Sequence, residues 1–210
     1  MDYIYLHGFA SSPNSAKAKY FHSAFAELSI DLKTPNLNQG NFSQLTITRQ
    51  IEQIKAEFPP SPTPVTLIGS SLGGLTAAWI AETSLQVQRL VLLAPAFEFL
   101  SHWLPQLAEA KLKQWQDEQY LMVYHYGEKR SLPLSYNFVL DAANYQDDRL
   151  LRPIPTLILH GCDDEVIPIA ASRNYASSRP WVQLIELNSD HALADVSRQW
   201  QQIKSFIQIS

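Results

Sequence analysis

A serine in a short glycine-flanked motif is the residue of this sequence best suited to covalent chemistry. Residues 69–73 read Gly-Ser-Ser-Leu-Gly and follow an apolar run that begins at Val65. A Gly-x-Ser-x-Gly pattern between a strand and a helix is typical of a nucleophile elbow, a strained turn that lifts a serine hydroxyl above the end of a sheet. The motif predicts that Ser71 is a nucleophile, because the neighbouring Ser70 falls outside its register. The backbone N–H groups that start the following helix would point at an anion formed beside Ser71.

A serine hydroxyl attacks well at neutral pH only when a base takes its proton and a third group fixes the tautomer of that base. His191 follows the last predicted strand, and no other histidine comes later in the chain. Asp164 follows the next-to-last predicted strand and is the candidate for the group that fixes the tautomer. Asp163 and Glu165 are neighbouring acids that could take this role, and Asp163 is the alternative. Nucleophile, acid and base thus occur in this order, each just beyond a predicted strand, where open α/β sheets place their sites. The spacing predicts a catalytic triad of Ser71, Asp164 and His191.

Short β-rich runs alternate with helical patterns, which is typical of an α/β fold with a mostly parallel central sheet flanked by helices. The predicted strands are Tyr3–Leu6, Asp31–Thr34, the run from Val65 into the serine motif, Arg89–Ala94, Thr156–His160 and Val182–Leu187. The predicted helices are Ser15–Leu28, Leu45–Phe58, the segment after the serine motif, and a closing helix Leu193–Ile209. A chain of 210 residues with 46% hydrophobic residues can bury one sizeable core, so we expect a single domain over residues 1–210.

The stretch between Ala94 and Thr156 is much longer than a simple crossover connection requires. We therefore expect a small cap, at roughly residues 97–150, inserted after the strand that ends near Ala94. Within it, the pattern of Ser101–Gln119 predicts a helix, and Tyr120–Tyr126 alternates toward a turn at residues 127–130, which predicts a hairpin. The aromatic side chains of the cap would either line an acyl or aryl pocket or pack the cap onto the body.

The composition indicates which partners the protein lacks and in which compartment it works. The net charge is −4 and the basic residues are scattered, which is unlike a nucleic-acid-binding surface. The longest nearly apolar stretch, Leu90–Phe97, is too short to span a bilayer, and the chain starts without a basic leader. The single cysteine, Cys162, excludes an intramolecular disulfide and suits a reducing compartment, and Cys and His residues do not occur at metal-ligand spacings. We expect a cytoplasmic protein with no metal, no cofactor, no nucleic-acid partner and no membrane partner.

Several segments together resemble the α/β-hydrolase superfamily: Tyr5–Phe9, the serine motif, His160–Pro168 and Asp190–His191. More narrowly, Leu6–Lys17, which reads LHGFASSPNSAK, and the Gly-Ser-Ser-Leu-Gly-Gly run resemble the YqiA/YcfP family of small bacterial esterases, over nearly the whole chain. The resemblance implies an α/β-hydrolase fold and an esterase or thioesterase that acts on a small-molecule ester or thioester with the triad named above. It also implies an oxyanion hole made by the backbone N–H groups of Phe9 and Leu72. The cap around Tyr136–Ala142 is similar to that of acyl-protein thioesterases.

Two other functions are compatible with the same residues, because one fold hosts several chemistries. A C–C bond hydrolase or lyase would use the triad for proton abstraction and would leave simple esters nearly untouched. A non-catalytic binding scaffold would keep the fold without the reaction, although the intact triad counts against it. His7 and His160 precede glycines at predicted strand ends, where we expect them to hold loops by hydrogen bonds.

Overall fold

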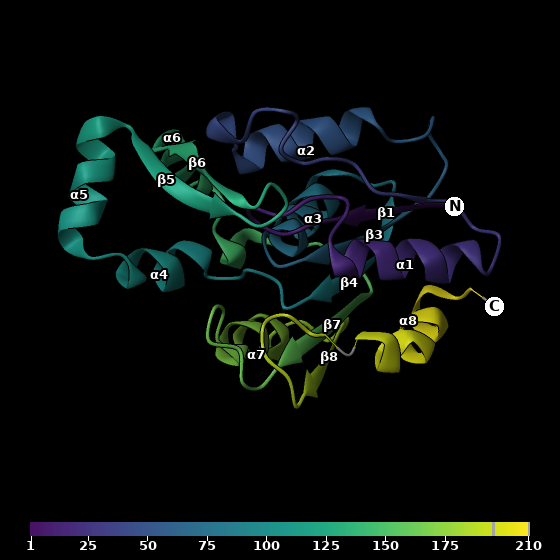
Figure 1. Cartoon of the computed structure of the whole chain (residues 1–210). Coiled ribbons are helices and arrows are strands. Elements are labelled where there is room, and N and C mark those ends of the chain that lie inside the picture. Colours follow the sequence, from purple (N-terminus) through teal and green to yellow (C-terminus); the bar gives the residue numbers. More distant parts are fainter. Residues whose placement is uncertain (195, 210) are drawn as a thin grey trace.

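The computed structural model describes residues 1–194 and 196–209, and a six-stranded sheet lies at its centre (Figure 1). The strand order is β2-β1-β3-β4-β7-β8, and every neighbouring pair is parallel. The strands are β1 (Asp2–Leu6), β2 (Leu32–Lys33), β3 (Val65–Ser70), β4 (Val87–Leu93), β7 (Thr156–Gly161) and β8 (Val182–Leu187). The predicted α/β class with a parallel central sheet is therefore confirmed, and each predicted strand is present with its ends shifted by at most two residues.

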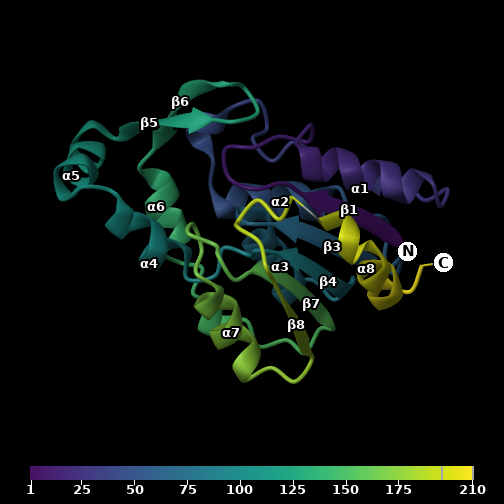
Figure 2. The same cartoon turned by 60° about the horizontal axis from the view of Figure 1, so that its bottom comes forward.

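Helices cover both faces of this sheet, which explains why every residue of the central strands β3 and β7 is buried (Figure 2). One face packs against α1 (Ala16–Ala26) and α8 (Trp200–Ile207), and the other against α2 (Ile47–Ala56), α3 (Leu72–Thr83) and α7 (Ile169–Ser177). Side chains alternate between the two cores along each strand, as the strand period of two requires. In β1, for example, Tyr3 and Tyr5 join the core under α1 and α8, whereas Ile4 and Leu6 join the other.

The segment between β4 and β7 projects from one end of the sheet and carries its own small elements (Figure 1). These are α4 (Phe99–Trp103), η2 (Leu104–Gln106), α5 (Glu109–Glu118), the antiparallel hairpin β5 (Tyr120–His125) and β6 (Arg130–Ser135), α6 (Asn137–Ala142) and η3 (Asp147–Arg149). The predicted hairpin is confirmed. The prediction of one helix over Ser101–Gln119 is wrong, because Pro105 sits in a 3-10 turn and Leu107 and Ala108 are extended, which divides the segment into two helices.

Three other predicted helices differ from the structure at their ends, and the first of them, predicted over Ser15–Leu28, spans Ala16–Ala26 with Ser15 as its N-cap. The helix predicted over Leu45–Phe58 begins at Ile47, since the side chain of Thr46 caps it by accepting a hydrogen bond from the Arg49 N–H at 3.0 Å. The predicted closing helix Leu193–Ile209 is wrong at its start: Leu193 has φ +46°, and helical structure comes as η4 (Val196–Gln199) followed by α8. Asp195, within that prediction, lies outside the described residues.

Two arginines fasten the end of the inserted segment to the body. The guanidinium of Arg179 donates to the carbonyl oxygens of Leu150 at 3.0 Å, Tyr175 at 2.8 Å and Asp147 at 3.1 Å. Arg152 donates in the same way to carbonyls at the end of α3 and the start of β4, namely those of Ala81, Ser84, Leu85 and Val87. These bonds satisfy carbonyls that a helix end leaves without partners, so they fix where the inserted segment returns to the sheet.

Across residues 1–194 and 196–209, no helix combines the length and the apolar character that crossing a bilayer would require.

Candidate active site

Ser71 occupies the turn between β3 and α3 in a backbone conformation that a non-glycine residue seldom adopts, with φ +53° and ψ −121°. Hydrogen bonds hold this turn, because the Ser71 N–H donates to the Leu93 carbonyl at 2.9 Å and the Ala96 N–H donates to the Ser71 carbonyl at 3.1 Å. Position 69 has no room for a side chain, because a Cβ there would lie 2.4 Å from the carbonyl oxygen of Gly73. The strain at Ser71 is the geometry that the Gly-x-Ser-x-Gly motif predicts.

The serine turn lies at the topological switch point of the sheet, between β1 and β3. The chain runs from β1 to β2 on one side and then returns to place β3 on the other side of β1. Such a switch point leaves a crevice beyond the carboxyl ends of the two strands, which is where open α/β sheets bind ligands. Gly8, just after β1, reaches this crevice, since a Cβ built on it would lie 3.2 Å from the Ser71 Cβ and 3.9 Å from its Oγ.

The two predicted oxyanion donors flank this crevice. Phe9 follows Gly8 directly, and Leu72 is the first residue of α3, where a backbone N–H has no partner within its own helix. Their role in binding an oxyanion stays a prediction.

The structure brings the three predicted triad residues into one hydrogen-bonded chain. The Ser71 Oγ lies 3.0 Å from the Nε2 of His191, and the Nδ1 of His191 lies 2.7 Å from the Oδ2 of Asp164. A carboxylate can only accept, so Nδ1 carries the proton of the neutral imidazole, and Nε2 is left to accept from the serine hydroxyl. These distances and this tautomer suit an imidazole that removes the serine proton.

Burial distinguishes Asp164 from the two acids beside it. Its side chain is enclosed, with the whole residue only 7% exposed, whereas Asp163 and Glu165 are exposed. The Oδ1 of Asp164 accepts the backbone N–H groups of Val166 at 2.9 Å and Ile167 at 2.8 Å. Burial by itself would raise the pKa of Asp164, but hydrogen bonds from His160, His191 and the Ile167 N–H together hold its pKa well below the usual range. Asp164 is therefore an anion throughout the neutral range.

A second histidine contacts the same carboxylate, and the sequence did not reveal this contact. His160, fully buried in β7, lies with its Nε2 3.1 Å from the Asp164 Oδ2 and 2.9 Å from the Ile167 carbonyl oxygen. Both oxygens beside Nε2 can only accept, so Nε2 is the donor, and Nδ1 accepts from the hydroxyl of Ser172 at 2.7 Å. His160 thus holds the loop that carries Asp164, as expected, and also supplies a hydrogen bond to the acid itself.

His7 holds the neighbouring loop, also as expected. Its Nδ1 donates to the Gly8 carbonyl at 2.9 Å, and its Nε2 accepts from the Leu37 N–H at 3.1 Å. Burial lowers the pKa of His7, which keeps it neutral and suited to this pair of bonds.

The inserted segment packs directly on the loop after β1. The ring of Phe9 lies 5.4 Å from that of Trp103 and 5.5 Å from that of Phe138, centroid to centroid. At the tip of the β5–β6 hairpin, the Tyr126 N–H donates to the Ala10 carbonyl at 2.8 Å. Aromatic side chains of the cap therefore pack against the body at Phe9, one residue after Gly8, which borders Ser71.

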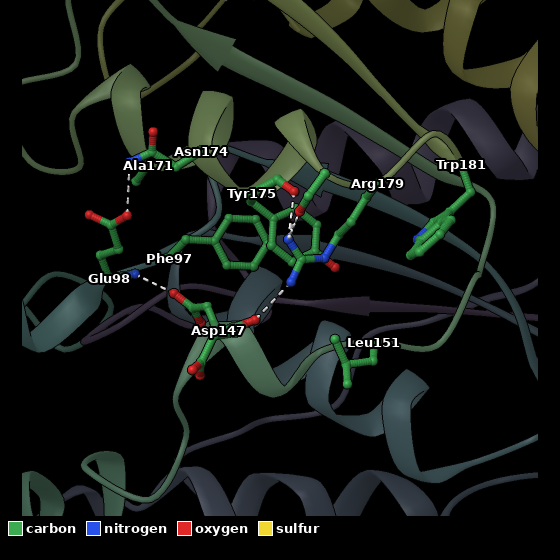
Figure 3. Close-up of a pocket in the computed structure, with 11 residues that line it drawn as sticks. Phe97, Glu98, Asp147, Leu151, Ala171, Asn174, Tyr175, Arg179 and Trp181 are labelled. Atoms are coloured by element: carbon green, nitrogen blue, oxygen red, sulfur yellow. Dashed lines mark hydrogen bonds between the residues drawn. The ribbon is translucent and has the colours of Figure 1, made fainter.

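A separate cavity of about 370 Å³ lies between α7 and the end of the inserted segment, and no triad residue lines it (Figure 3). Arg179 lies over the ring of Tyr175, 4.2 Å from its centroid. Asp147 bridges the two ends of the inserted segment, because its Oδ2 accepts the backbone N–H of Glu98 at 2.5 Å. Its Oδ1 is buried without a partner among the described residues, and burial raises the pKa of Asp147 to about 7.

Replacing this carboxyl by an amide should stabilise the protein in a pH-dependent way. The folded-state pKa of Asp147 is above its unfolded value, so the folded chain binds the extra proton between about pH 4 and pH 7, and stability falls as the pH rises through that window. Asp147→Asn removes this cost. We expect its Tm to exceed that of the wild type by about 2–8 °C at pH 8 and to match it near pH 4. Asp148→Asn, at the exposed neighbouring carboxyl, is the control; a Tm difference for Asp147→Asn that is equal at both pH values would contradict the assignment.

Within the described residues, no group of three or more His, Cys, Asp or Glu side chains is arranged to hold a metal ion.

The fold has many relatives among solved structures. Alpha/beta hydrolase domain-containing protein 10 from mouse matches with a TM-score of 0.79 and 22% identity, over 99% of this chain and 89% of the mouse chain. Est1E from Butyrivibrio proteoclasticus, solved with ferulic acid bound, matches with a TM-score of 0.78 and 20% identity, over 98% of this chain and 87% of its own. A pyrethroid hydrolase from Sphingobium faniae JZ-2 matches with a TM-score of 0.68 and 19% identity, over 98% and 96% of the two chains. The protein therefore has the α/β-hydrolase fold.

A comparison with curated protein sequences gave no match. The family model described as "Uncharacterised protein family (UPF0227)" matches residues 2–208, which is nearly the whole chain. This chain is thus a member of the UPF0227 family, with an α/β-hydrolase fold.

Proposed function

We propose that the protein is a serine hydrolase of carboxylic esters or thioesters, with Ser71 as the nucleophile, His191 as the general base and Asp164 as the group that orients the base. The observation that carries this proposal is the unbroken chain of hydrogen bonds from the Ser71 Oγ through both nitrogens of His191 to the buried carboxylate of Asp164. A protein without the reaction has no need to hold a strained serine beside an imidazole in its nucleophile-activating tautomer.

The reaction would proceed in two halves. His191 Nε2 takes the proton of Ser71 as Oγ attacks the carbonyl carbon, and the negative charge that develops on the carbonyl oxygen faces the N–H groups of Phe9 and Leu72. The C–O or C–S bond breaks as the imidazolium returns the proton to the leaving alcohol or thiol. In the second half, His191 takes a proton from water, whose oxygen attacks the acyl-enzyme; the bond to Oγ breaks, Ser71 regains its proton and the carboxylic acid leaves.

The names of the structural relatives support a hydrolase. They include Est1E with bound ferulic acid, a pyrethroid hydrolase and a monoacylglycerol lipase from Paleococcus ferrophilus. Their identities to this chain are low, so the acyl group and the leaving group have to come from experiment. The proposal is therefore limited to a small-molecule substrate that carries an ester or a thioester.

The first test compares the wild type with Ser71→Ala on a panel of p-nitrophenyl esters and acyl thioesters. We expect turnover by the wild type and a loss on the order of 10⁴-fold or more in the variant, because no other group can form the acyl-enzyme. A fluorophosphonate probe should label the wild type at Ser71 and leave the variant unlabelled. Ser70→Ala, one residue earlier and buried in β3, is the matched control and should keep both signals.

The outcomes distinguish this proposal from its alternatives. Hydrolysis that persists at a near-normal rate in Ser71→Ala would show that the reaction does not use this serine. Labelling of Ser71 without ester or thioester turnover would favour a C–C bond hydrolase or lyase. A wild type that neither turns over the panel nor reacts with the probe would favour a binding scaffold.

A further inference from the structure

Lys17 lies in the first turn of α1, where a lysine is unfavourable. It is the second residue of α1, after the N-cap Ser15, whose side chain accepts the Ala18 N–H at 3.3 Å. The first turn of a helix has a partial positive charge, so a cation there is unfavourable, and this turn contains no acidic residue that would offset it. Lys17 is also half-buried, unlike the exposed Lys19 on the same helix. A residue that is unfavourable for its helix in this way is expected to make a favourable interaction with another part of the fold.

The ammonium of Lys17 contacts the loop that carries His191. Its Nζ donates to the carbonyl oxygen of Ala192, the next residue after the histidine, at 2.6 Å. Burial lowers the pKa of Lys17 to about 8, while the nearby carboxylates of Asp164 and Asp190 act in the opposite direction and favour its charged form. The cation therefore lies among the acids of the site, and titrates close to neutral pH.

The loop that carries His191 is irregular, and contacts on both sides of the histidine hold it. Between the end of β8 at Leu187 and the start of η4, the described residues form no helix or strand (Figure 2). On the N-terminal side of His191, the carbonyl of Ser189 accepts the Asp163 N–H at 3.1 Å. On its C-terminal side, the Leu193 side chain is buried in the core beneath α1 and α8, and Lys17, 175 positions before Ala192, ties the Ala192 carbonyl to α1. The backbone on the C-terminal side of His191 is thus held by Lys17 together with the buried side chain of Leu193.

We propose that Lys17 is a positioning residue: its ammonium fixes the Ala192 carbonyl and thereby holds the His191 imidazole in line between Ser71 and Asp164. This inference rests on the proposed function for its kinetic consequences, but the positioning itself does not depend on the substrate. A displacement of about 1 Å of a catalytic group can lower a rate on the order of 100-fold. The loss of the tether should therefore be visible in turnover more than in substrate binding.

The kinetic test uses three variants. Lys17→Met should lower kcat about tenfold to 100-fold and change KM about twofold at most. Lys17→Arg retains a permanent cation that can reach the carbonyl, and should recover most of kcat. In the wild type, kcat should fall above pH 8 as Lys17 loses its proton; this fall should be absent in Lys17→Arg. Lys19→Met, which removes an exposed charge from the same helix, should behave as the wild type.

A spectroscopic test is independent of any substrate. The proton on His191 Nδ1, bonded to Asp164, should give a far-downfield ¹H resonance in the wild type, in Lys19→Met and in Ser71→Ala. In Lys17→Met this resonance should broaden or disappear, while the circular dichroism spectrum stays that of the wild type. An unchanged resonance or an unchanged kcat in folded Lys17→Met, or an equal loss in the Arg and Met variants, would overturn the proposal. If Ser71 proves unreactive, the proposed function fails, and the resonance still decides the role of Lys17.

Discussion

Asp164→Asn is expected to lower kcat about 10⁴-fold while leaving the protein folded, the size of loss that a triad suffers when its base is held in the wrong tautomer. The reason lies in the contacts of the two carboxylate oxygens. Oδ1 accepts two backbone N–H groups, so the amide oxygen of asparagine must take that place. The NH₂ group then replaces Oδ2 and faces the Nδ1 of His191 and the Nε2–H of His160. His191 would have to accept on Nδ1 and hold its proton on Nε2, where it can no longer receive one from Ser71.

The measurement is kcat for the best ester or thioester of the panel, with circular dichroism to verify the fold. Asp163→Asn is the matched control, since it makes the same change at the adjacent, exposed carboxyl and should leave kcat within about threefold of the wild type. A small loss in Asp164→Asn together with a large loss in Asp163→Asn would transfer the role of the acid to Asp163. Equal, small losses in both would mean that the base works without a carboxylate.

Gly73→Ala should strongly destabilise the fold at the turn that carries Ser71. The added Cβ would lie 2.3 Å from the Leu6 carbonyl oxygen and 2.5 Å from that of His7, and both are backbone atoms at the end of β1, next to β3 in the sheet. Since neither can rotate away, α3 has to move off the sheet. We expect a cost of about 3 kcal/mol or more, even though alanine favours a helix by about 1 kcal/mol relative to glycine. For a chain of this size that corresponds to a fall in Tm of about 6–12 °C.

Gly74→Ala is the control for this prediction, because it adds the same methyl group with the same gain in helix propensity one position later. Its Cβ would lie 3.1 Å from the Cα and Cβ of Pro95 and 3.2 Å from the Gly69 carbonyl oxygen, so these neighbours need to shift by only a few tenths of an ångström. Thermal unfolding of the two variants should therefore give clearly different midpoints, with Gly74→Ala close to the wild type. Equal midpoints would show that the close approach of α3 to β1 does not limit stability.

The fold class, and the proximity of Ser71, Asp164 and His191, could be predicted from the sequence because both depend on local signals. The serine motif carries its own turn geometry, and strand ends are visible as apolar runs that stop at polar residues. Asp164 and His191 could be selected because each follows such a run. The choice between Asp164 and Asp163 could not be made with certainty from sequence alone, since it depends on which carboxyl the loop turns inward; burial of Asp164 and exposure of Asp163 answer that question.

Contacts between segments that are distant in the chain could not be predicted from the sequence. The bond of His160 to Asp164 depends on the loop folding back over β7, and the bond of Lys17 to Ala192 joins α1 to the loop after β8. The break at Pro105 was open to prediction, because proline in a helical pattern is a signal in itself; the apolar spacing of Ser101–Gln119 suggested one helix that the structure does not contain. Whether the cap's aromatic side chains also line an acyl pocket stays a prediction.

The hydrogen bond between the Tyr126 N–H and the Ala10 carbonyl makes the cap hairpin a structural support of the loop that carries Phe9. Gly127 reinforces this contact, because a Cβ there would come within 2.8 Å of the Ser12 Cβ, so the hairpin tip and the loop fit without spare volume. If the proposed reaction is correct, a bulky acyl group that pushed the hairpin outward would draw this loop with it, and would displace the Phe9 N–H from the oxyanion that it is proposed to bind. Selection among substrates of different size would then occur during bond formation, after binding, and oversized esters would act as competitive inhibitors.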